Sequence, residues 1–379
     1  MEMIGEQMRL LGVIDHFGSG GAQRQFTELM AALATRGHHV EVFIYHPGHQ
    51  FFRARLETAG VRIRECDRSV VGAWGTLRAL GRALEELRPQ AVISFLGAPN
   101  MLAETARLGG RIPVLLVSER SSRHGDRSAL AAWAGRVLHL CADRVVTNST
   151  YHGEWLEDRF PWLRGRVRCI YNGISPEYFA IPPPAQPCGE LRMLAIGRIS
   201  RDKNPLVVAE ACALHAARHG WSPQVTWVGR PGERAEDGPH RAAVDAVLAR
   251  EPRVGKAWRW IGESKQVPEL MAEHHLLVHP SLYEGLPNVV CEALAAGRPV
   301  LASRVCEHPR LIGQAGERGR LFRADDPAEL VGAIDAVVSQ SSEEWMAMTG
   351  RCKAFAQAEL AVDRMVAGYE ALIEEVASP

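Results

Sequence analysis

Short apolar runs alternate with longer stretches of helical periodicity along almost the whole chain. The first apolar run extends from Arg9 to Asp15, and the glycine-rich turn Phe17–Gly21 follows it. Apolar residues then recur at helical spacing from Ala22 to Thr35, and the run His39–Ile44 reads as a second strand. This order is typical of the start of a doubly wound α/β domain. The other strands predicted in the first half are Val61–Ile63, Ala91–Phe95, Pro113–Val117, Arg144–Thr147 and Val167–Ile170.

The alternation stops between Ser175 and Glu190, a stretch that contains five prolines. The run Pro182–Pro184 fits neither a helix nor a central strand and suits a stiff, extended linker. The alternation then restarts, and a long helical stretch from roughly Glu343 to Val376 ends the chain. The elements predicted in this part are strands Leu191–Ile196, Gln224–Val228, Trp258–Ile261, Leu276–His279 and Pro299–Ser303, and helices near 204–219, 239–250, 287–296 and 326–339.

The pattern therefore predicts an α/β protein with two Rossmann-like, doubly wound parallel-sheet domains. We expect the first over residues 1–178 and the second over residues 191–359, with a hinge around Pro182. A length of 379 residues fits two domains of ordinary size. Ligands of open parallel sheets bind beyond the carboxyl ends of the strands, so both sheets can face one cleft.

Composition narrows the class of protein. Lys+Arg and Asp+Glu are both 44, and a net charge of zero speaks against nucleic acid as the partner. The eight cysteines are scattered singly, which predicts neither a zinc cluster nor a disulfide framework. No run approaches the ~18 apolar residues of a membrane span, and residues 1–8 lack the apolar region of a signal peptide. We therefore expect a cytoplasmic protein.

The segment from His279 to Val300 is the most informative. It reads as strand, loop, helix, glycine stop, proline and strand, with Pro287 in the first turn of the helix. Asn288, Val289 and Val290 would then offer free backbone N–H groups, which make a helix N-terminus an anion site.

Two carboxylates flank this helix start. Glu284 lies on the loop before it, and Glu292 lies one turn after Asn288. A carboxylate accepts hydrogen bonds from sugar hydroxyls, so the pair suits a phosphorylated sugar. The alternative, that Glu292 simply caps and solvates a helix, stays open on spacing alone.

Arg198 and Lys203 flank a short turn directly after the strand that ends near Gly197. Two fixed cations at the carboxyl end of a strand can clamp a diphosphate, and Lys203 is one of only four lysines. The alternative is a pair of solvated surface cations. The turn Phe17–Gln23 offers glycines for close backbone approach, but it lacks the full Gly-x-Gly-x-x-Gly spacing, and no acidic residue ends the second strand, which counts against a nicotinamide enzyme.

Together and in this order, these segments make the chain similar to the family 4 glycosyltransferases, which are retaining enzymes with two Rossmann-like domains, the GT-B fold. The resemblance extends over essentially the whole chain, and the block from Pro280 to Val300 is its most specific part. The matching segments are Gly20–Gln23, Arg36–Val40, Ile170–Ile174, Ile196–Arg198 with Lys203, Trp260–Gly262 and Pro280–Val300.

The resemblance implies a role for each matching residue. Arg198 and Lys203 would hold the donor diphosphate and stabilise the leaving group, while Glu284 would contact the donor sugar without acting as a covalent nucleophile. Glu292 would bind the nucleotide ribose, and the C-terminal helix, from about residue 360, would cross back onto the first domain. The other donor-binding positions implied are Gly20 and Gly21 from the first domain, Gly262 and Glu263 near the base, and Gly285, Leu286, Asn288 and Val289 beside the sugar and phosphate.

The acceptor side departs from the family pattern. Many relatives carry a histidine after the fifth strand, where this chain has Ser118-Glu119-Arg120, with His124 several residues later. Glu119 or Arg120 would contact the acceptor or donor, or the two would form a structural salt bridge; the residues leave both open. His16, at the end of the first strand, is a further acceptor candidate.

The stretch from Arg107 to Arg168 contains eleven arginines and fewer acidic residues. Contact with an anionic membrane surface, or with a lipid-linked acceptor, is one interpretation; a solvated face in an arginine-rich protein is the other. The first would place the cytoplasmic protein peripherally at the inner membrane face.

The sequence thus predicts a retaining hexosyltransferase that moves a sugar from a nucleotide-diphosphate sugar, with a UDP-sugar favoured, to a hydroxyl acceptor, in surface polysaccharide or glycolipid biosynthesis. The resemblance implies no metal or other cofactor, and the chain has no Asp-x-Asp motif. Two alternatives remain: a sugar-nucleotide 2-epimerase of similar architecture, and a non-catalytic nucleotide-sugar-binding protein.

Overall fold

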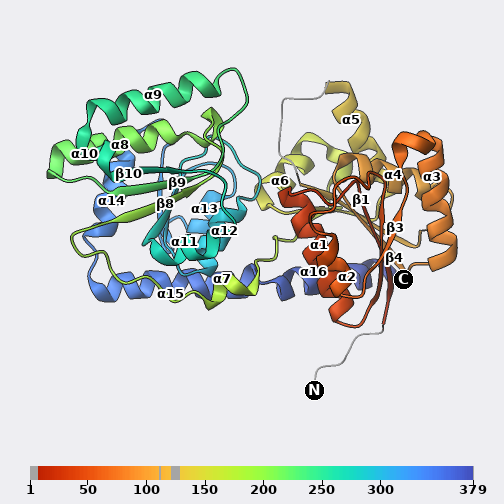
Figure 1. Cartoon of the computed structure of the whole chain (residues 1–379). Helices are drawn as coiled ribbons and strands as arrows, with labels where there is room; N and C mark the ends of the chain where they lie inside the picture. The colour runs from red at the N-terminus through yellow and green to blue at the C-terminus, as the bar shows by residue number, and fades with distance from the viewer. Residues whose placement is uncertain (1–6, 111, 121–128, 379) are drawn as a thin grey trace. The chain divides into compact units, whose positions relative to one another are not determined.

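The computed structural model describes residues 7–110, 112–120 and 129–378, and the chain divides into two compact units. Unit 1 comprises Met1–Gly173 and Val362–Pro379, and unit 2 comprises Ile174–Ala361. Each unit is built on its own parallel sheet with helices packed against it (Figure 1).

Unit 1 contains a seven-stranded sheet within the described residues, in the order β3-β2-β1-β4-β5-β6-β7, with every pair parallel. Leu10 and Ile14 of β1 belong to one hydrophobic cluster, and Leu11 and Val13 belong to another, so the sheet is buried on both faces. Burial on both faces explains why its strands read as continuous apolar runs. The strands are β1 (Arg9–Ile14), β2 (His39–Ile44), β3 (Arg62–Glu65), β4 (Ala91–Phe95), β5 (Val114–Glu119), β6 (Arg144–Thr147) and β7 (Val167–Cys169).

The helices of unit 1 form a layer on each face of the sheet. They are α1 (Gly21–Thr35), α2 (Arg53–Thr58), α3 (Arg68–Leu87), α4 (Gly97–Arg107), α5 (Ala129–Leu138), α6 (Thr150–Arg159) and α16 (Val362–Ala377), with short 3₁₀ turns at His139–Cys141 and Pro161–Leu163. Side chains of α1 and α16 share one cluster, whereas those of α3, α4 and α6 share the other.

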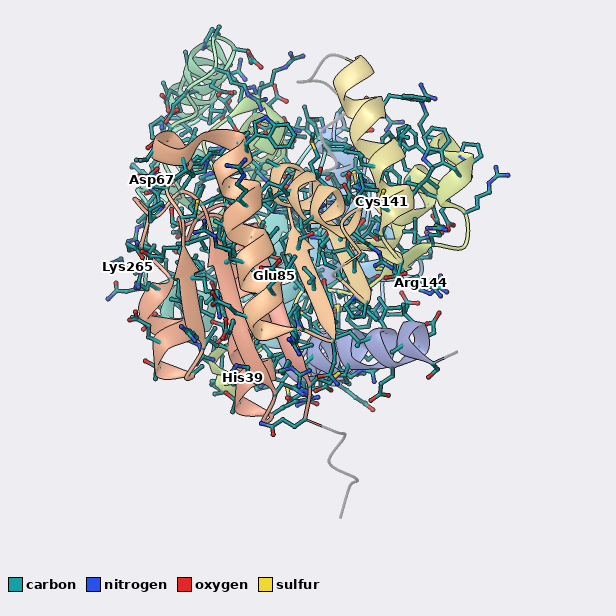
Figure 2. All side chains as sticks on the ribbon, turned by 90° about the vertical axis from the view of Figure 1, so that its right-hand side faces the viewer. His39, Asp67, Glu85, Cys141, Arg144 and Lys265 are labelled. Atoms are coloured by element: carbon teal, nitrogen blue, oxygen red, sulfur yellow. The ribbon has the colours of Figure 1, made fainter. Side chains whose placement is uncertain are left out.

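The last helix, α16, packs beside the first, α1. Arg36, at the end of α1, forms an ion pair with Glu370 at 2.6 Å. Arg144 of β6, labelled in Figure 2, reaches Glu375 at 2.7 Å. Gly173 allows the start of α16 to approach, since a Cβ there would lie 2.8 Å from the Cα of Val362. The C-terminal segment is thus an integral part of unit 1, as the family resemblance implies.

Unit 2 has a six-stranded parallel sheet within the described residues, in the order β10-β9-β8-β11-β12-β13. Its strands are β8 (Arg192–Ile196), β9 (Gln224–Val228), β10 (Trp258–Ile261), β11 (Leu276–His279), β12 (Val300–Ser303) and β13 (Gly319–Phe322). The sequence pattern did not predict the edge strand β13, because it contains only two apolar residues, Leu321 and Phe322. It begins at Gly319, where a Cβ would lie 1.9 Å from the carbonyl oxygen of Val300, so glycine is needed for the two strands to pair.

The helices of unit 2 are α7 (Pro176–Ala180), α8 (Pro205–His219), α9 (Asp237–Arg250), α10 (Pro252–Ala257), α11 (Val267–Glu273), α12 (Asn288–Ala295), α13 (His308–Ile312), α14 (Pro327–Val338) and α15 (Ser342–Glu359), with a 3₁₀ turn at Arg201–Lys203. The single C-terminal helix predicted from sequence is in fact two helices, α15 and α16, and the chain passes from unit 2 back to unit 1 between them. Ser341 starts α15 with a capping box to Glu344.

The proline-rich stretch belongs to unit 2 rather than forming the connection between the units. The chain leaves unit 1 earlier, between Gly173 and Ile174. Prolines cannot donate to a sheet, but their carbonyl groups accept hydrogen bonds: Trp345 Nε1 donates to the Pro184 carbonyl at 2.9 Å, and the Arg298 guanidinium donates to that of Pro182 at 2.5 Å. The predicted hinge around Pro182 is therefore a segment hydrogen-bonded to Trp345 of α15 and to Arg298, in the loop after α12.

No helix within the described ranges is both long enough and apolar enough to span a membrane.

Candidate active site

The loops after β8 and β11 meet where the strand order of the unit 2 sheet reverses. These two strands are neighbours in the sheet, although β9 and β10 lie between them in the sequence. Ligands of open parallel sheets bind beyond the carboxyl ends of the strands at such a point. Arg198 and Lys203 follow β8, and Glu284 follows β11. The fold therefore brings the three predicted catalytic residues to the edge where a ligand site is expected.

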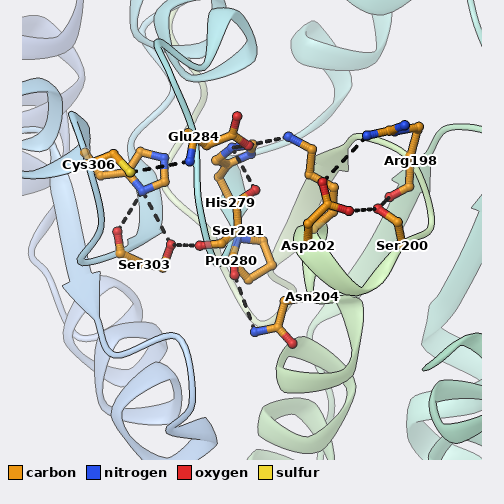
Figure 3. A network of polar contacts seen from close by, with 12 residues as sticks. Arg198, Ser200, Asp202, Asn204, His279, Pro280, Ser281, Glu284, Ser303 and Cys306 are labelled. Atoms are coloured by element: carbon orange, nitrogen blue, oxygen red, sulfur yellow. Dashed lines mark hydrogen bonds and ion pairs between the residues drawn. The ribbon is translucent and has the colours of Figure 1, made fainter. Parts of the chain in front are cut away.

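Lys203, Glu284 and His279 form one polar cluster at this edge. Glu284 and His279 are labelled in Figure 3. The ammonium group of Lys203 forms an ion pair with Glu284 Oε1. His279, the last residue of β11, has its Nε2 3.0 Å from the same oxygen. Among the described residues, both partners of this carboxylate thus engage Oε1, so Oε2 is the atom placed to accept a further hydrogen bond.

The Glu284 carboxylate is held in its ionised form. The side chain is only 13% exposed, and burial alone would raise its pKa. The hydrogen bond from His279 and the charge of Lys203 outweigh burial and hold the pKa of Glu284 well below its ordinary value. Burial lowers the pKa of His279 despite this contact, so a neutral His279 donates Nε2–H to the carboxylate. Glu284 can therefore accept hydrogen bonds near neutral pH, but it is unsuited to donate a proton.

Hydrogen bonds between the loops fix this cluster. Leu282 N–H donates to the Asp202 carbonyl at 2.9 Å, which joins the loop after β11 to the loop after β8. Asn204, in the left-handed conformation at φ 53°, ends the 3₁₀ turn that carries Lys203 and donates to the Ala324 carbonyl at 2.7 Å. The stem of Lys203 packs against the backbone of Gly197. Lys203 is thus built into the site, and the alternative of a solvated surface cation does not describe it.

Arg198 is more open to solvent than Lys203. Its side chain is 39% exposed, and its guanidinium lies 3.6 Å from the Asp202 carboxylate, which also accepts from the Ser200 hydroxyl at 2.6 Å. Each of the two predicted cations therefore has a carboxylate neighbour. Lys203 lies in a close ion pair with Glu284, whereas Arg198 is more distant from Asp202. Sequence analysis named Glu284 but did not predict its pairing with Lys203, and it did not identify Asp202.

The loops after β9 and β10 reach the same edge. Gly229 allows close contact with the loop after β8, because a Cβ there would lie 2.1 Å from the Gly197 carbonyl oxygen. Arg230, the next residue, is 3.6 Å from the exposed Glu263 carboxylate. Gly262 and Glu263, which were predicted near the nucleotide base, are thus exposed residues at the carboxyl edge of the sheet.

The start of α12 differs in one respect from the prediction. Pro287 is the N-cap residue, and the N–H of Val290 donates to the Pro287 carbonyl at 3.0 Å. Val290 therefore does not offer a free N–H group to an anion. Asn288 and Val289 are half-buried in the first turn, and so is Gly285 in the loop before it. Leu286 and Glu292 are buried.

Two residues of this site were missed from the sequence. His279 ends β11, and the rule that selected Arg198, a polar residue at the carboxyl end of a strand, would have found it. Cys306 has an unusual left-handed backbone, at φ 48°, and its Sγ accepts the Glu284 N–H at 3.4 Å. Burial raises the pKa of this thiol, so Cys306 is a neutral support for the Glu284 backbone. No sequence signal marks that role.

In unit 1, Glu119 ends β5 inside a buried network. Its carboxylate is 2.9 Å from His139 Nε2 and 3.0 Å from the Arg136 guanidinium, and the other ring nitrogen of His139 contacts Glu104. Burial alone would raise the pKa of Glu119, but the histidine contacts and the Arg136 charge hold it well below its ordinary value. In the same network, burial would lower the pKa of His139, but its two carboxylate partners raise it to about 9.

Arg120 turns to a different set of partners. Its guanidinium donates to the Tyr369 hydroxyl at 2.9 Å, to the Ser118 hydroxyl at 2.7 Å and to the Asn172 side-chain oxygen, and it lies over the ring of Phe95. The predicted alternative of a structural salt bridge between Glu119 and Arg120 is therefore wrong, since each residue has its own partners. His124 lies outside the described residues.

The end of β1 carries the remaining candidates. His16 is half-buried, and its Nδ1 accepts the Gly18 N–H at 2.8 Å. Gly20 is the N-cap of α1, and Gly21 is its first residue, and both are exposed. This position corresponds in unit 1 to the position of Arg198 in unit 2, since each follows the first strand of its sheet.

Most described arginines of the basic stretch from 107 to 168 are engaged within unit 1. The ion pairs are Arg107–Asp143, Arg136–Glu119, Arg144–Glu375 and Arg168–Glu375. Arg166 donates to the carbonyl groups of Leu140 and Ala142. Four of the eight described arginines of this stretch are thus paired with carboxylates, while Arg111, Arg123 and Arg127 lie outside the described residues.

Comparison with known proteins defines the class. Residues 19–178 match the family described as Glycosyltransferase Family 4, and residues 190–340 match the family described as Glycosyl transferases group 1. The lipopolysaccharide core biosynthesis glycosyltransferase LpsE of Rhizobium meliloti is 27% identical over 331 residues, 86% of this chain and 88% of that protein. The GalNAc-alpha-(1->4)-GalNAc-alpha-(1->3)-diNAcBac-PP-undecaprenol alpha-1,4-N-acetyl-D-galactosaminyltransferase of Campylobacter jejuni is 22% identical over 346 residues, 88% of this chain and 90% of that protein.

Solved structures agree in fold over nearly the whole length. A glycosyltransferase from Rickettsia africae has a TM-score of 0.82 at 14% identity, covering 98% of this chain and 99% of that one. Anabaena Alr3699/HepE, solved in complex with UDP, has a TM-score of 0.78 at 16% identity, covering 97% of this chain and 100% of that one. The protein is therefore a glycosyltransferase. It belongs to the family 4 glycosyltransferases and has their GT-B fold of two Rossmann-like domains.

Proposed function

We propose that this glycosyltransferase transfers a hexose from a UDP-sugar to a hydroxyl group with retention of anomeric configuration, and that its donor site is the edge of unit 2 that carries Arg198, Lys203 and Glu284. The observation that carries the proposal is the Lys203–Glu284 ion pair at the reversal of strand order. Two relatives support the choice of donor and pathway. HepE was solved with UDP, and LpsE is named for lipopolysaccharide core biosynthesis.

The donor diphosphate would lie against the two cations. When the bond from the sugar to the diphosphate breaks, negative charge develops on the leaving phosphate oxygen. Fixed cations stabilise that charge without reorganising, which is usually the largest contribution to such catalysis. Lys203 is held by Glu284 and by the packing of its stem, whereas Arg198, at 3.6 Å from Asp202, has more freedom to turn to the ligand.

Glu284 would bind the donor sugar rather than attack it. Its Oε1 is occupied by Lys203 and His279, and Oε2 is available for a sugar hydroxyl. The depressed pKa keeps the carboxylate an acceptor. In this mechanism the acceptor hydroxyl attacks on the face that the diphosphate leaves, the departing phosphate takes the hydroxyl proton, and configuration is retained without a glycosyl-enzyme bond.

The acceptor would be lipid-linked. The name of the Campylobacter jejuni relative includes an undecaprenol diphosphate-linked glycan, and unit 1 exposes apolar side chains in the first half of α3. Val70 and Trp74 are 79% and 78% exposed, and Val71 and the arginine Arg78 are also exposed there. We define these four residues as the α3 patch. Apolar side chains beside a cation suit peripheral contact with an anionic membrane.

Cleavage of UDP-sugars tests the site. Arg198→Ala, Lys203→Ala and Glu284→Ala should each reduce the rate by about 10²-fold or more, as removal of an electrostatic stabiliser does. Lys265→Ala and Glu273→Ala, at exposed positions of unit 2, serve as controls and should stay near wild type. Near-wild-type rates in all three site variants would contradict the assignment. Conversion of the UDP-sugar to its 2-epimer without any acceptor would instead favour the epimerase alternative.

A further inference from the structure

A second group of polar side chains lies in unit 2, where α8 packs against α14. His215 and His219 are one turn apart near the end of α8, and Asp335 faces them from α14. Asp335 Oδ1 is 3.6 Å from His215 Nε2 and 3.0 Å from His219 Nε2. Among the residues that the structure describes, this is the one group of three His, Cys, Asp or Glu side chains with ligand atoms all within 4.8 Å of one another.

The distances from Asp335 to the two histidines suit a tetrahedral metal ion, and all three ligand atoms lie within 4.8 Å of one another. An ion about 2.0 to 2.1 Å from each ligand places the ligand atoms about 3.3 Å apart. The two distances to Asp335 lie on either side of that value. Two histidines at positions i and i+4 of a helix project from one face, so α8 itself supplies two ligands, and α14 supplies the third.

The surroundings orient the ligands as in protein metal sites. His215 Nδ1 lies 3.1 Å from the Trp221 carbonyl, which only accepts, so Nδ1 carries the proton and the Nε2 lone pair faces Asp335. Arg218 is 3.2 Å from the other oxygen of Asp335. Such partners fix the tautomer and the direction of the ligands.

We propose that His215, His219 and Asp335 bind a divalent transition-metal ion, with Zn²⁺ as the ion that the donor set suits best. Two imidazoles and a carboxylate are ordinary zinc ligands, and water would complete the shell, because His219 and Asp335 are partly exposed. His215 lies ten residues into α8, about 15 Å along the helix from Pro205. The ion would therefore tie α8 to α14 and take no part in the transfer reaction.

Zn²⁺ binding to the full-length protein, stripped with a chelator and then titrated in competition with a chromophoric chelator, tests this site. We expect one Zn²⁺ per chain, with an affinity at least tenfold weaker in His219→Ala and in Asp335→Asn. His39→Ala is the matched control, because His39 also faces a carboxylate, that of Glu41 at 3.5 Å, but should leave the affinity unchanged. Co²⁺ at the wild-type site should give the absorption of tetrahedral cobalt.

A second readout separates loss of the site from loss of the fold. Saturating Zn²⁺ should raise the Tm of the wild type by about 5 °C and leave the Tm of His219→Ala unchanged. Without metal, the Tm of the His219→Ala variant should stay near that of the stripped wild type, since His219 is partly exposed. Equal Zn²⁺ affinity in the wild type, His219→Ala and Asp335→Asn would overturn the proposal, and so would the absence of any Zn²⁺ binding by the wild type. Neither result depends on the glycosyltransferase assignment.

Discussion

The side chains of Lys203 and Glu284 form an ion pair between the loops that follow two neighbouring strands, β8 and β11. Both side chains are largely withdrawn from solvent, and His279 supports the same carboxylate oxygen. The pair joins two loops that are 81 residues apart in the sequence. The pair therefore holds the two loops together, in addition to its proposed role in binding the donor.

Replacing either Lys203 or Glu284 alone should lower the free energy of unfolding by more than half as much as replacing both. Glu284→Ala or Lys203→Ala leaves a half-buried charge unpaired, so we expect each to lower the free energy of unfolding by about 2 kcal/mol, and the double variant to lose less than the sum. Urea unfolding of the ligand-free protein measures this coupling. The same cycle on the exposed pair Arg230–Glu263 is the control and should give a coupling below about 0.5 kcal/mol. Additive losses at Lys203 and Glu284 would contradict the account.

The buried His139 network should make unit 1 sensitive to alkaline pH. Its two carboxylate partners, Glu104 and Glu119, raise the pKa of His139 to about 9 in the folded state. A raised folded-state pKa contributes stability that is complete below the unfolded value of about 6.5 and is lost as pH rises through about 9. Arg136, which also faces Glu119, stays charged throughout. Hydrogen exchange of β5 and α4 amides should therefore show lower protection at pH 9.5 than at pH 7.

His139→Gln provides the comparison for this prediction. Glutamine keeps hydrogen-bonding groups but does not titrate, so the variant should be less stable than wild type at pH 7 and should lose little more between pH 7 and pH 9.5. His39→Ala, at an exposed histidine, should behave like wild type. A wild-type protection that does not change over this range, after correction for the intrinsic exchange rate, would show that His139 does not change charge there.

Arg298 should be essential for the stability of unit 2. It is 1% exposed and donates to the carbonyl groups of Pro182, Ala272 and Ala296. Arg298→Ala leaves these acceptors buried without their donor, so we expect a loss of about 3 kcal/mol in the free energy of unfolding. Arg298→Lys should recover little, because one ammonium group cannot replace a planar fork of donors. Urea unfolding measures both, and Arg253→Ala, at an exposed arginine of the same unit, is the control. A loss below about 1 kcal/mol in Arg298→Ala would show that the proline segment is not held in this way.

The α3 patch should contribute to membrane binding. Trp74→Ala removes its largest apolar side chain, which is 78% exposed, so binding to vesicles with anionic lipid should fall by about tenfold. Met346→Ala in unit 2, also at an exposed apolar residue, is the matched control. Co-sedimentation with vesicles containing phosphatidylserine measures both variants. Equal binding by Trp74→Ala and wild type would remove the patch from the account.

The fold could be predicted from the sequence largely because its strands are buried on both faces. Such strands read as continuous apolar runs, and β1, β4 and β8 lie within a residue of where those runs predict them. The pattern of apolar residues did not predict the elements whose structure does not depend on the burial of their own side chains. The short edge strand β13 has too few apolar residues to be recognised. The proline segment near Pro182 looked like a free linker, because the buried donors that hold it, such as Arg298, come from distant parts of the chain.

The residues of the candidate site could be predicted where they lie close to the carboxyl ends of predicted strands. Arg198, Lys203 and Glu284 were found because each lies in the loop that follows a predicted strand. Their partners were not, since neither Asp202 nor Cys306 carries a pattern of its own, and the contact of Cys306 depends on a left-handed backbone. The contacts of Glu119 likewise come from His139 and Arg136, whose approach depends on how α5 and the turn after it pack. Pairing across elements is a property of packing, which periodicity does not encode.

The most direct test of the account compares the affinity of the ligand-free protein for UDP and for UMP by titration calorimetry. If Arg198 and Lys203 hold the diphosphate, the wild type should bind UDP more tightly than UMP, and Lys203→Ala should lose about tenfold or more in UDP affinity but much less in UMP affinity. The control Lys265→Ala should match wild type with both ligands. An unchanged preference for UDP over UMP in Lys203→Ala would contradict the claim that this edge of unit 2 is the donor diphosphate site.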